Sequence, residues 1–208
     1  MIPAREALEA LREGNRRFVG DLGHDAGRSS IRRRVLPADQ DPVAIILGCS
    51  DARVPAEIVF DQGLGDLFVI RVAGNIVAPS QVGSVEFAAE AFGTRLVVVL
   101  GHSHCGAIRA TIEQLLHPSR EQSRNLSSIV DRIRPAVEGL LERRPPPEHA
   151  VLEQQAVRDN IRMSADHLRH GSAVLEQLIQ KHGLMIVGAE YSLETGVVDF
   201  FDGVPALR

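Results

Sequence analysis

Four short, nearly continuous apolar runs constrain the fold of this chain more than any other feature of its sequence. Each has the length of a strand, is rich in β-branched side chains, and does not alternate polar with apolar residues. Such runs are typical of strands that helices cover on both faces, as in a parallel sheet. The runs are Val43–Gly48, Leu67–Val72, Leu96–Leu100 and Leu184–Ala189.

Helical sequence separates these runs. The alanine-rich stretch Val82–Phe92 predicts a crossover helix between the second and third runs, and most of 107–182 has a helical pattern that breaks at Arg143–Pro147. After the fourth run, Gly196 is expected to turn the chain into Val197–Phe201, an antiparallel edge strand. Alternating strands and helices therefore predict an α/β fold, with a mainly parallel β-sheet flanked by helices.

The N-terminal residues are expected to form a helical arm. Leu8, Leu11 and Phe18 recur among charged residues, as on an amphipathic helix, and Gly20 is expected to end that helix. A length of 208 residues with 44% hydrophobic residues suits one ordinary domain whose core needs no disulfides. We therefore expect a single domain over residues 1–208, with residues 1–35 as its N-terminal helical arm.

Charge and hydropathy argue against two classes of partner. The formal net charge is −4, and the one basic run, Arg28 with Arg32–Arg34, has no interleaved aromatic residue, so nucleic acid is not an expected partner. No segment reaches the roughly 18 consecutive apolar residues of a membrane span, and the first residues lack the apolar stretch of a secretory signal. We expect a cytoplasmic protein that binds neither nucleic acid nor membrane.

The two cysteines of the chain follow two of the predicted strands. Cys49 comes directly after the first run, and the third run leads into His102 and Cys105. Functional groups gather at the carboxyl ends of parallel strands, so both thiols are expected at one edge of the sheet. Two thiolates and one imidazole are ligands that zinc favours, and a catalytic zinc keeps a fourth position open. The sequence therefore predicts a metal centre.

Two histidines compete for the third ligand position. His102 and Cys105 stand three residues apart and would face the same way in the first turn of a helix, whereas His104 should point to the rim or to solvent. Each cysteine alone could be a small buried hydrophobe, and each histidine alone a satisfied polar residue. The joint pattern favours a metal. A redox thiol pair is a rival interpretation, although no Cys-x-x-Cys spacing supports it.

Asp51 and Arg53 form a second candidate group. They stand two residues apart in a strand-to-loop turn and can form a charge-assisted, bidentate pair. Alone, such a pair would equally well be a structural salt bridge. Next to a zinc thiolate, an ionised Asp51 could instead orient a water molecule on the metal.

These segments resemble the signatures of the β-carbonic anhydrases, in particular the plant-like subgroup. The two main motifs are Cys49–Arg53 (CSDAR) and Gly101–Gly106 (GHSHCG). Residues 61–71, 73–75, 83–86 and 188–196 are also similar to that family, whereas residues 117–150 are only weakly so.

The resemblance implies a reaction and a ligand set. It implies one Zn²⁺ per chain on Cys49, His102 and Cys105, reversible hydration of carbon dioxide to bicarbonate, and Asp51 with Arg53 as the catalytic dyad. Members of the family also exist in a closed state in which the aspartate itself binds zinc, so Asp51 is a metal ligand only in such a state. The family forms oligomers, and we expect a homodimer or tetramer.

The resemblance also implies substrate-binding residues. Gly106 would offer its backbone N–H to bicarbonate, and Gln40 matches a glutamine that reaches substrate across a dimer interface. Phe68 and Ala73 fall at apolar pocket positions, and so does Phe87, where the subgroup often has tyrosine. From the residues alone, Gln40 would be a loop residue and the two phenylalanines core residues.

Other functions are compatible with the same residues. A relative within the family could hydrolyse carbonyl sulfide or carbon disulfide with the same metal chemistry. A protein of another class could hold zinc as a structural, regulatory module. The expected open fourth position and the Asp51–Arg53 pair favour an enzyme.

Overall fold

The five predicted strands form one sheet in a computed structural model that describes residues 2–23, 40–118, 123–145 and 147–205. The order in the sheet is β2-β1-β3-β4-β5; β4 and β5 are antiparallel and all other neighbours parallel. This confirms the predicted fold class. The bounds are β1 Ala44–Gly48, β2 Leu67–Arg71, β3 Leu96–His102, β4 Met185–Tyr191 and β5 Val198–Asp202.

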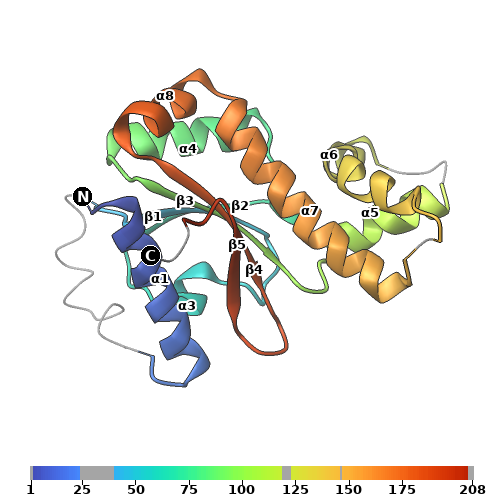
Figure 1. Ribbon diagram of the computed structural model, residues 1–208, viewed down its shortest axis with the longest axis horizontal. Helices are drawn as coiled ribbons and strands as arrows, with labels where there is room; N and C mark the ends of the chain where they lie inside the picture. The colour runs from blue at the N-terminus through green and yellow to red at the C-terminus, as the bar shows by residue number, and fades with distance from the viewer. Residues whose placement is uncertain (1, 24–39, 119–122, 146, 206–208) are drawn as a thin grey trace.

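Helices cover both faces of the sheet, as the unbroken apolar runs predict. In Figure 1, α4 (Pro79–Ala91), α7 (His149–His170) and α8 (Ala173–His182) lie on one side. On the other side lie α1 (Ala4–Val19) and the short α3 (Ala56–Val59). Successive residues of β1 pack into different cores: Ile45 joins the core under α4, α7 and α8, and Ile46 the core under α1 and α3. Burial on both sides explains why no polar residue alternates with the apolar ones.

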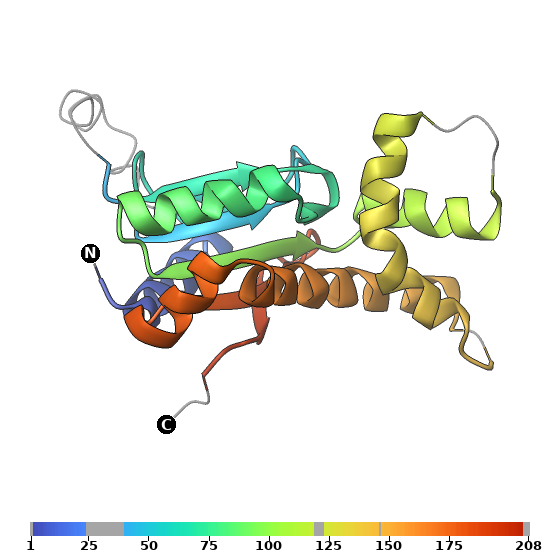
Figure 2. The ribbon, with the colours of Figure 1, turned by 90° about the horizontal axis from the view of Figure 1, so that it is seen from above.

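Two helices extend the fold beyond the carboxyl ends of the parallel strands. Figure 2 shows α5 (Gly106–Leu116) and α6 (Arg124–Leu141) past the tip of β3. The long helix α7 then returns along the sheet. The predicted break at Arg143–Pro147 falls between α6 and α7, although Pro146 lies outside the described residues.

Some predicted boundaries were wrong by a turn or less. The crossover helix α4 begins at Pro79 rather than Val82, because proline suits the first turn of a helix, where its missing N–H costs nothing. The third strand runs on to His102 instead of ending at Leu100. The spacing of His102 and Cys105 had suggested that His102 lies in the first turn of a helix. It is instead the last residue of a strand.

The predicted N-terminal helix is present as α1 and ends at Gly20. Its apolar side is buried against its own chain: Leu8 and Leu11 are almost fully buried in the second core. Asn15 donates to the carbonyls of Val59 and Gly196 and accepts from the N–H of Val198. Residues 24–35 of the expected arm, which include the whole basic run, lie outside the described residues.

Helix α7 approaches the sheet so closely that two strand positions next to it are glycines. A Cβ at Gly101 would lie 2.5 Å from Ile161 Cδ1, and one at Gly188 would lie 2.8 Å from Ile161 Cγ2. This contact fixes α7 beside the end of β3, where the candidate site begins. Within the described ranges, no helix is both long enough and apolar enough to span a membrane.

Candidate metal centre

Three buried side chains meet where β1 and β3 end. Cys49 follows β1, His102 is the last residue of β3, and Cys105 caps the N-terminus of α5. Because β1 and β3 are parallel neighbours, their ends lie together. The sulfur atoms and an imidazole nitrogen all lie within 4.8 Å of one another, and the three residues are at most 5% exposed. These three atoms could hold a metal ion.

The imidazole of His102 is oriented for a metal. Its Nδ1 lies 2.8 Å from the carbonyl oxygen of Ser103, and a carbonyl can only accept, so Nδ1 carries the proton. Nε2 is then left with its lone pair; it is buried and has no hydrogen-bond partner among the described residues. An orphaned nitrogen beside two thiols fits a bound cation, which would supply the missing partner.

The two thiols have unequal acidities. A hydrogen bond from Cys105, together with the N–H of Gly74, lowers the pKa of Cys49 to about 4 despite burial. The same hydrogen bond to Cys49, together with burial, raises the pKa of Cys105. Cys49 is therefore the more acidic of the two thiols, and the thiolate is the form that binds metals.

Asp51 and Arg53 form the predicted bidentate pair. Arg53 Nε lies 2.9 Å from Asp51 Oδ1 and Nη2 lies 2.8 Å from Oδ2, while the Arg53 N–H also donates to Oδ1 at 2.9 Å. These bonds hold the pKa of the Asp51 carboxyl well below its usual range. Asp51 Oδ2 is also 3.9 Å from His102 Nε2, so an ionised carboxylate lies beside the three candidate ligands while it is turned toward arginine.

Side-chain and backbone groups of neighbouring segments hold this strand end in place. The guanidinium of Arg71, from β2, donates to the carbonyl oxygens of Cys49 and Asp51. The N–H of Gly74 lies 3.4 Å from Cys49 Sγ, and the carbonyl of Gly74 accepts from Asn160 of α7. From the sequence alone, no role is expected for Arg71, Gly74 or Asn160. Only their placement beside Cys49 reveals one.

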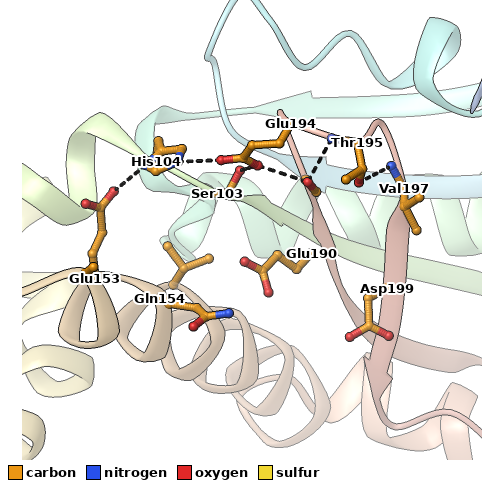
Figure 3. Close-up of a pocket in the computed structure, with 12 residues that line it drawn as sticks. Ser103, His104, Glu153, Gln154, Glu190, Glu194, Thr195, Val197 and Asp199 are labelled. Carbon is orange, nitrogen blue, oxygen red and sulfur yellow. Dashed lines mark hydrogen bonds and ion pairs between the residues drawn. The ribbon is translucent and has the colours of Figure 1, made fainter. Parts of the chain in front are cut away.

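His104 turns away from this cluster. Its backbone φ is +54°, which rotates the chain between His102 and Cys105 and explains how a strand residue and a helix cap meet. Figure 3 shows the ring between two carboxylates, with Nε2 2.5 Å from Glu194 and Nδ1 3.6 Å from Glu153. It lines a separate cleft of about 440 Å³. The structure thus brings His102, and not His104, beside the cysteines.

The expected substrate-binding residues are more dispersed. Ala73 begins a short 3-10 turn, η3 (Ala73–Asn75), beside the cluster, and Gly106 is the first, exposed residue of α5. Phe68 and Phe87 touch, with ring centroids 6.2 Å apart, and Phe87 is 55% exposed. Gln40 is exposed and stands at the beginning of the second described range.

Comparisons with known proteins agree with this site. A family model described as carbonic anhydrase matches residues 44–198. Carbonic anhydrase 2 of Mycobacterium tuberculosis is 38% identical, over 91% of this chain and 89% of that protein. The solved structure of the β-carbonic anhydrase CcaA matches with a TM-score of 0.73 and 26% identity, over 97% of this chain and 93% of that one.

A second solved structure shows the same fold at lower identity. It is one of two tetrameric β-carbonic anhydrases of the ascomycete Sordaria macrospora, with a TM-score of 0.73 and 21% identity over 81% of this chain and 85% of that one. The family match spans both strand ends that carry Cys49, His102 and Cys105. This chain belongs to the β-carbonic anhydrase family.

Proposed function

We propose that this protein interconverts carbon dioxide and bicarbonate with one zinc ion per chain, held by Cys49, His102 and Cys105. The observation that carries the proposal is the convergence, beside an arginine-paired carboxylate, of two sulfur atoms and one imidazole nitrogen that has no hydrogen-bond partner in the described part of the chain. Three protein ligands leave the fourth position that a catalytic zinc needs. A structural zinc is normally closed by a fourth protein ligand, which argues against the regulatory module.

The residues around the ion have separate tasks. When bound, zinc supplies Lewis acidity, which makes a water molecule reactive near neutral pH. Arg53 keeps Asp51 ionised, so that its carboxylate is a fixed hydrogen-bond acceptor beside the open position. Gly106 begins α5, where backbone N–H groups lack helical partners and can donate to an anionic oxygen of bicarbonate.

We further propose that the active protein is a homodimer or tetramer. Phe87 leaves more than half of its surface exposed, and it packs edge-on against Phe92, at 5.6 Å between centroids, and against Phe68 of the edge strand β2. A partner subunit on this face would cover the aromatic group. In such an oligomer, Gln40 of one subunit would reach the active site of its neighbour. Phe68, Ala73 and Phe87 would form the apolar lining of that active site.

Metal analysis with stopped-flow hydration assays tests the proposal. We expect one zinc per chain and rapid hydration in the native protein. Cys49→Ser should lose both, because it removes the most acidic ligand, whereas His104→Asn, on the other side of the turn, should keep its zinc. Hydration that survives in Cys49→Ser would contradict the assignment. Parallel assays with carbonyl sulfide and carbon disulfide identify the preferred substrate.

A further inference from the structure

The sulfur of Cys49 accepts a hydrogen bond from a segment other than its own strand end. The Gly74 N–H lies 3.4 Å from Cys49 Sγ, an ordinary distance for a sulfur acceptor. A donor at this position stabilises negative charge on the sulfur and lowers the electron density that the sulfur can give to a cation. The direction of this one N–H therefore affects how Cys49 binds a metal.

The N–H of Gly74 has this direction because of an unusual backbone conformation. Gly74 has a φ of +70°, which L-residues with a side chain rarely adopt, and a Cβ there would lie 2.7 Å from Ile133 Cδ1. In the surrounding turn, the N–H of Asn75 donates to the carbonyl of Val72. A glycine in so short a turn is free to rotate unless something holds it.

Asn160 supplies that restraint from a separate helix. Its side-chain amide donates to the Gly74 carbonyl at 2.8 Å, and the residue is only 2% exposed. The next residue, Ile161, packs into the space left by Gly101 and Gly188, which fixes α7 against the sheet. The amide of Asn160 is therefore held rigidly. It fixes the carbonyl of Gly74, while the N–H of Gly74 points at the Cys49 sulfur.

We propose that Asn160 is a positioning residue of the metal centre, acting through Gly74 to aim a backbone N–H at the Cys49 sulfur. The inference rests on the proposed metal site. Without the Asn160 amide, the Gly74 carbonyl is left buried and unpaired, and the turn relaxes to find another donor. The N–H then moves away from the sulfur, and Cys49 becomes a stronger electron donor.

Cobalt substitution tests this role without relying on enzymatic activity. Co²⁺ in a thiolate site gives a sulfur-to-metal charge-transfer band, whose energy falls when the sulfur loses a hydrogen bond. In Asn160→Ala and Asn160→Leu we expect this band at lower energy, because the sulfur donates more strongly. We also expect a zinc dissociation constant raised about tenfold, because the ligand is no longer held in place and this loss outweighs the stronger donation. Leucine branches at the same atom as asparagine and is larger, so it leaves no cavity, and a cavity is not the cause of a shift that both variants share.

Asn15→Ala is the matched control. Asn15 is also a buried helical asparagine, 5% exposed, and it bonds backbone groups on the opposite face of the sheet. We expect this variant to lose stability but to keep the native band and zinc affinity. Native spectra and affinities in both Asn160 variants would overturn the proposal, and so would failure of both to fold under conditions where Asn15→Ala is folded.

The same measurements separate this inference from the proposed function. If the native protein binds neither Co²⁺ nor Zn²⁺ through its thiols, the metal site itself is wrong, and the role of Asn160 is wrong with it. If the native protein shows the thiolate band and hydrates carbon dioxide while the Asn160 variants are indistinguishable from it, only the role of Asn160 is refuted.

Discussion

Replacing Gly101 by alanine is expected to destabilise the protein and to disturb its metal centre at the same time. A Cβ at this position would lie 2.5 Å from Ile161 Cδ1 and 2.6 Å from Ile161 Cγ1. Ile161 is fully buried, so its side chain has no space to move into. Overpacking of this kind costs about 1–3 kcal/mol. For a chain of this length, that corresponds to a melting temperature lower by roughly 2–12 °C.

A double-mutant cycle tests whether this contact is the cause. Ile161→Ala alone should cost about 2–5 kcal/mol, because it leaves a cavity. In the double variant the new methyl group of residue 101 occupies part of that cavity. The combined loss should therefore be smaller than the sum of the two by about 0.5–3 kcal/mol. Losses that simply add, measured by chemical denaturation, would refute the close-packing explanation.

Gly139→Ala is the same chemical change as Gly101→Ala, but it is expected to raise the stability of the protein instead of lowering it. Among the described residues, no heavy atom outside the adjacent backbone of α6 lies within 4 Å of a Cβ at Gly139, so alanine should stabilise the protein by about 0.5–1 kcal/mol. Because Gly101 precedes His102, we also expect Gly101→Ala to retain less zinc per chain and the double variant to recover part of it. Equal zinc retention in the native protein and in Gly101→Ala would show that the strand end tolerates the shift.

Three further outcomes are expected. Asp51→Asn should keep its zinc but hydrate carbon dioxide at least about 10²-fold more slowly, because it loses the ionised acceptor beside the metal. Metal analysis and stopped-flow assays check this, and a native hydration rate in the variant would contradict it. Hydrogen bonds from Ser103 and other groups lower the pKa of Glu194 from 4.5 to about 2, so it stabilises the fold above pH 4.5 and loses this effect as the pH falls toward 2. The gap in unfolding free energy between the native protein and Glu194→Gln should therefore close over that range in urea titrations, and a gap that is constant with pH would be inconsistent with this pKa. Phe87→Arg should lower the molecular mass in sedimentation experiments at micromolar protein, and an unchanged mass would place the subunit interface elsewhere.

Much of the fold could be predicted because it depends on local apolar patterns. Runs such as Val43–Gly48 are buried on both faces, and that burial leaves an unmistakable absence of polar residues. The convergence of Cys49 with Cys105 was predictable for a related reason, because parallel strands bring their carboxyl ends to one edge. From their spacing we expected His102 and Cys105 to face the same way in a helical turn. They do lie together, but the positive φ of His104, and not a helical turn, brings them together.

The rest depends on contacts between distant segments, which no local pattern reveals. Asn160 is one polar residue in a long amphipathic helix, and only the close approach of α7 to the sheet shows that its amide reaches Gly74, 86 residues away. The packing of α1 against the sheet of its own chain likewise depends on Asn15. Its side chain forms hydrogen bonds with residues up to 183 positions away in the sequence. Gln40 and Phe87 lie on exposed surface, so their expected roles depend on a partner subunit.

The rate of carbon dioxide hydration as a function of zinc occupancy tests the central claim most directly. One preparation of the native protein is depleted of metal with a chelator and reloaded in steps, with zinc per chain and initial rate measured at each step. We predict a rate that is negligible without zinc, rises in proportion to occupancy, and reaches its maximum at one zinc per chain. A substantial rate at zero occupancy, or no hydration in the fully loaded protein, would contradict the account.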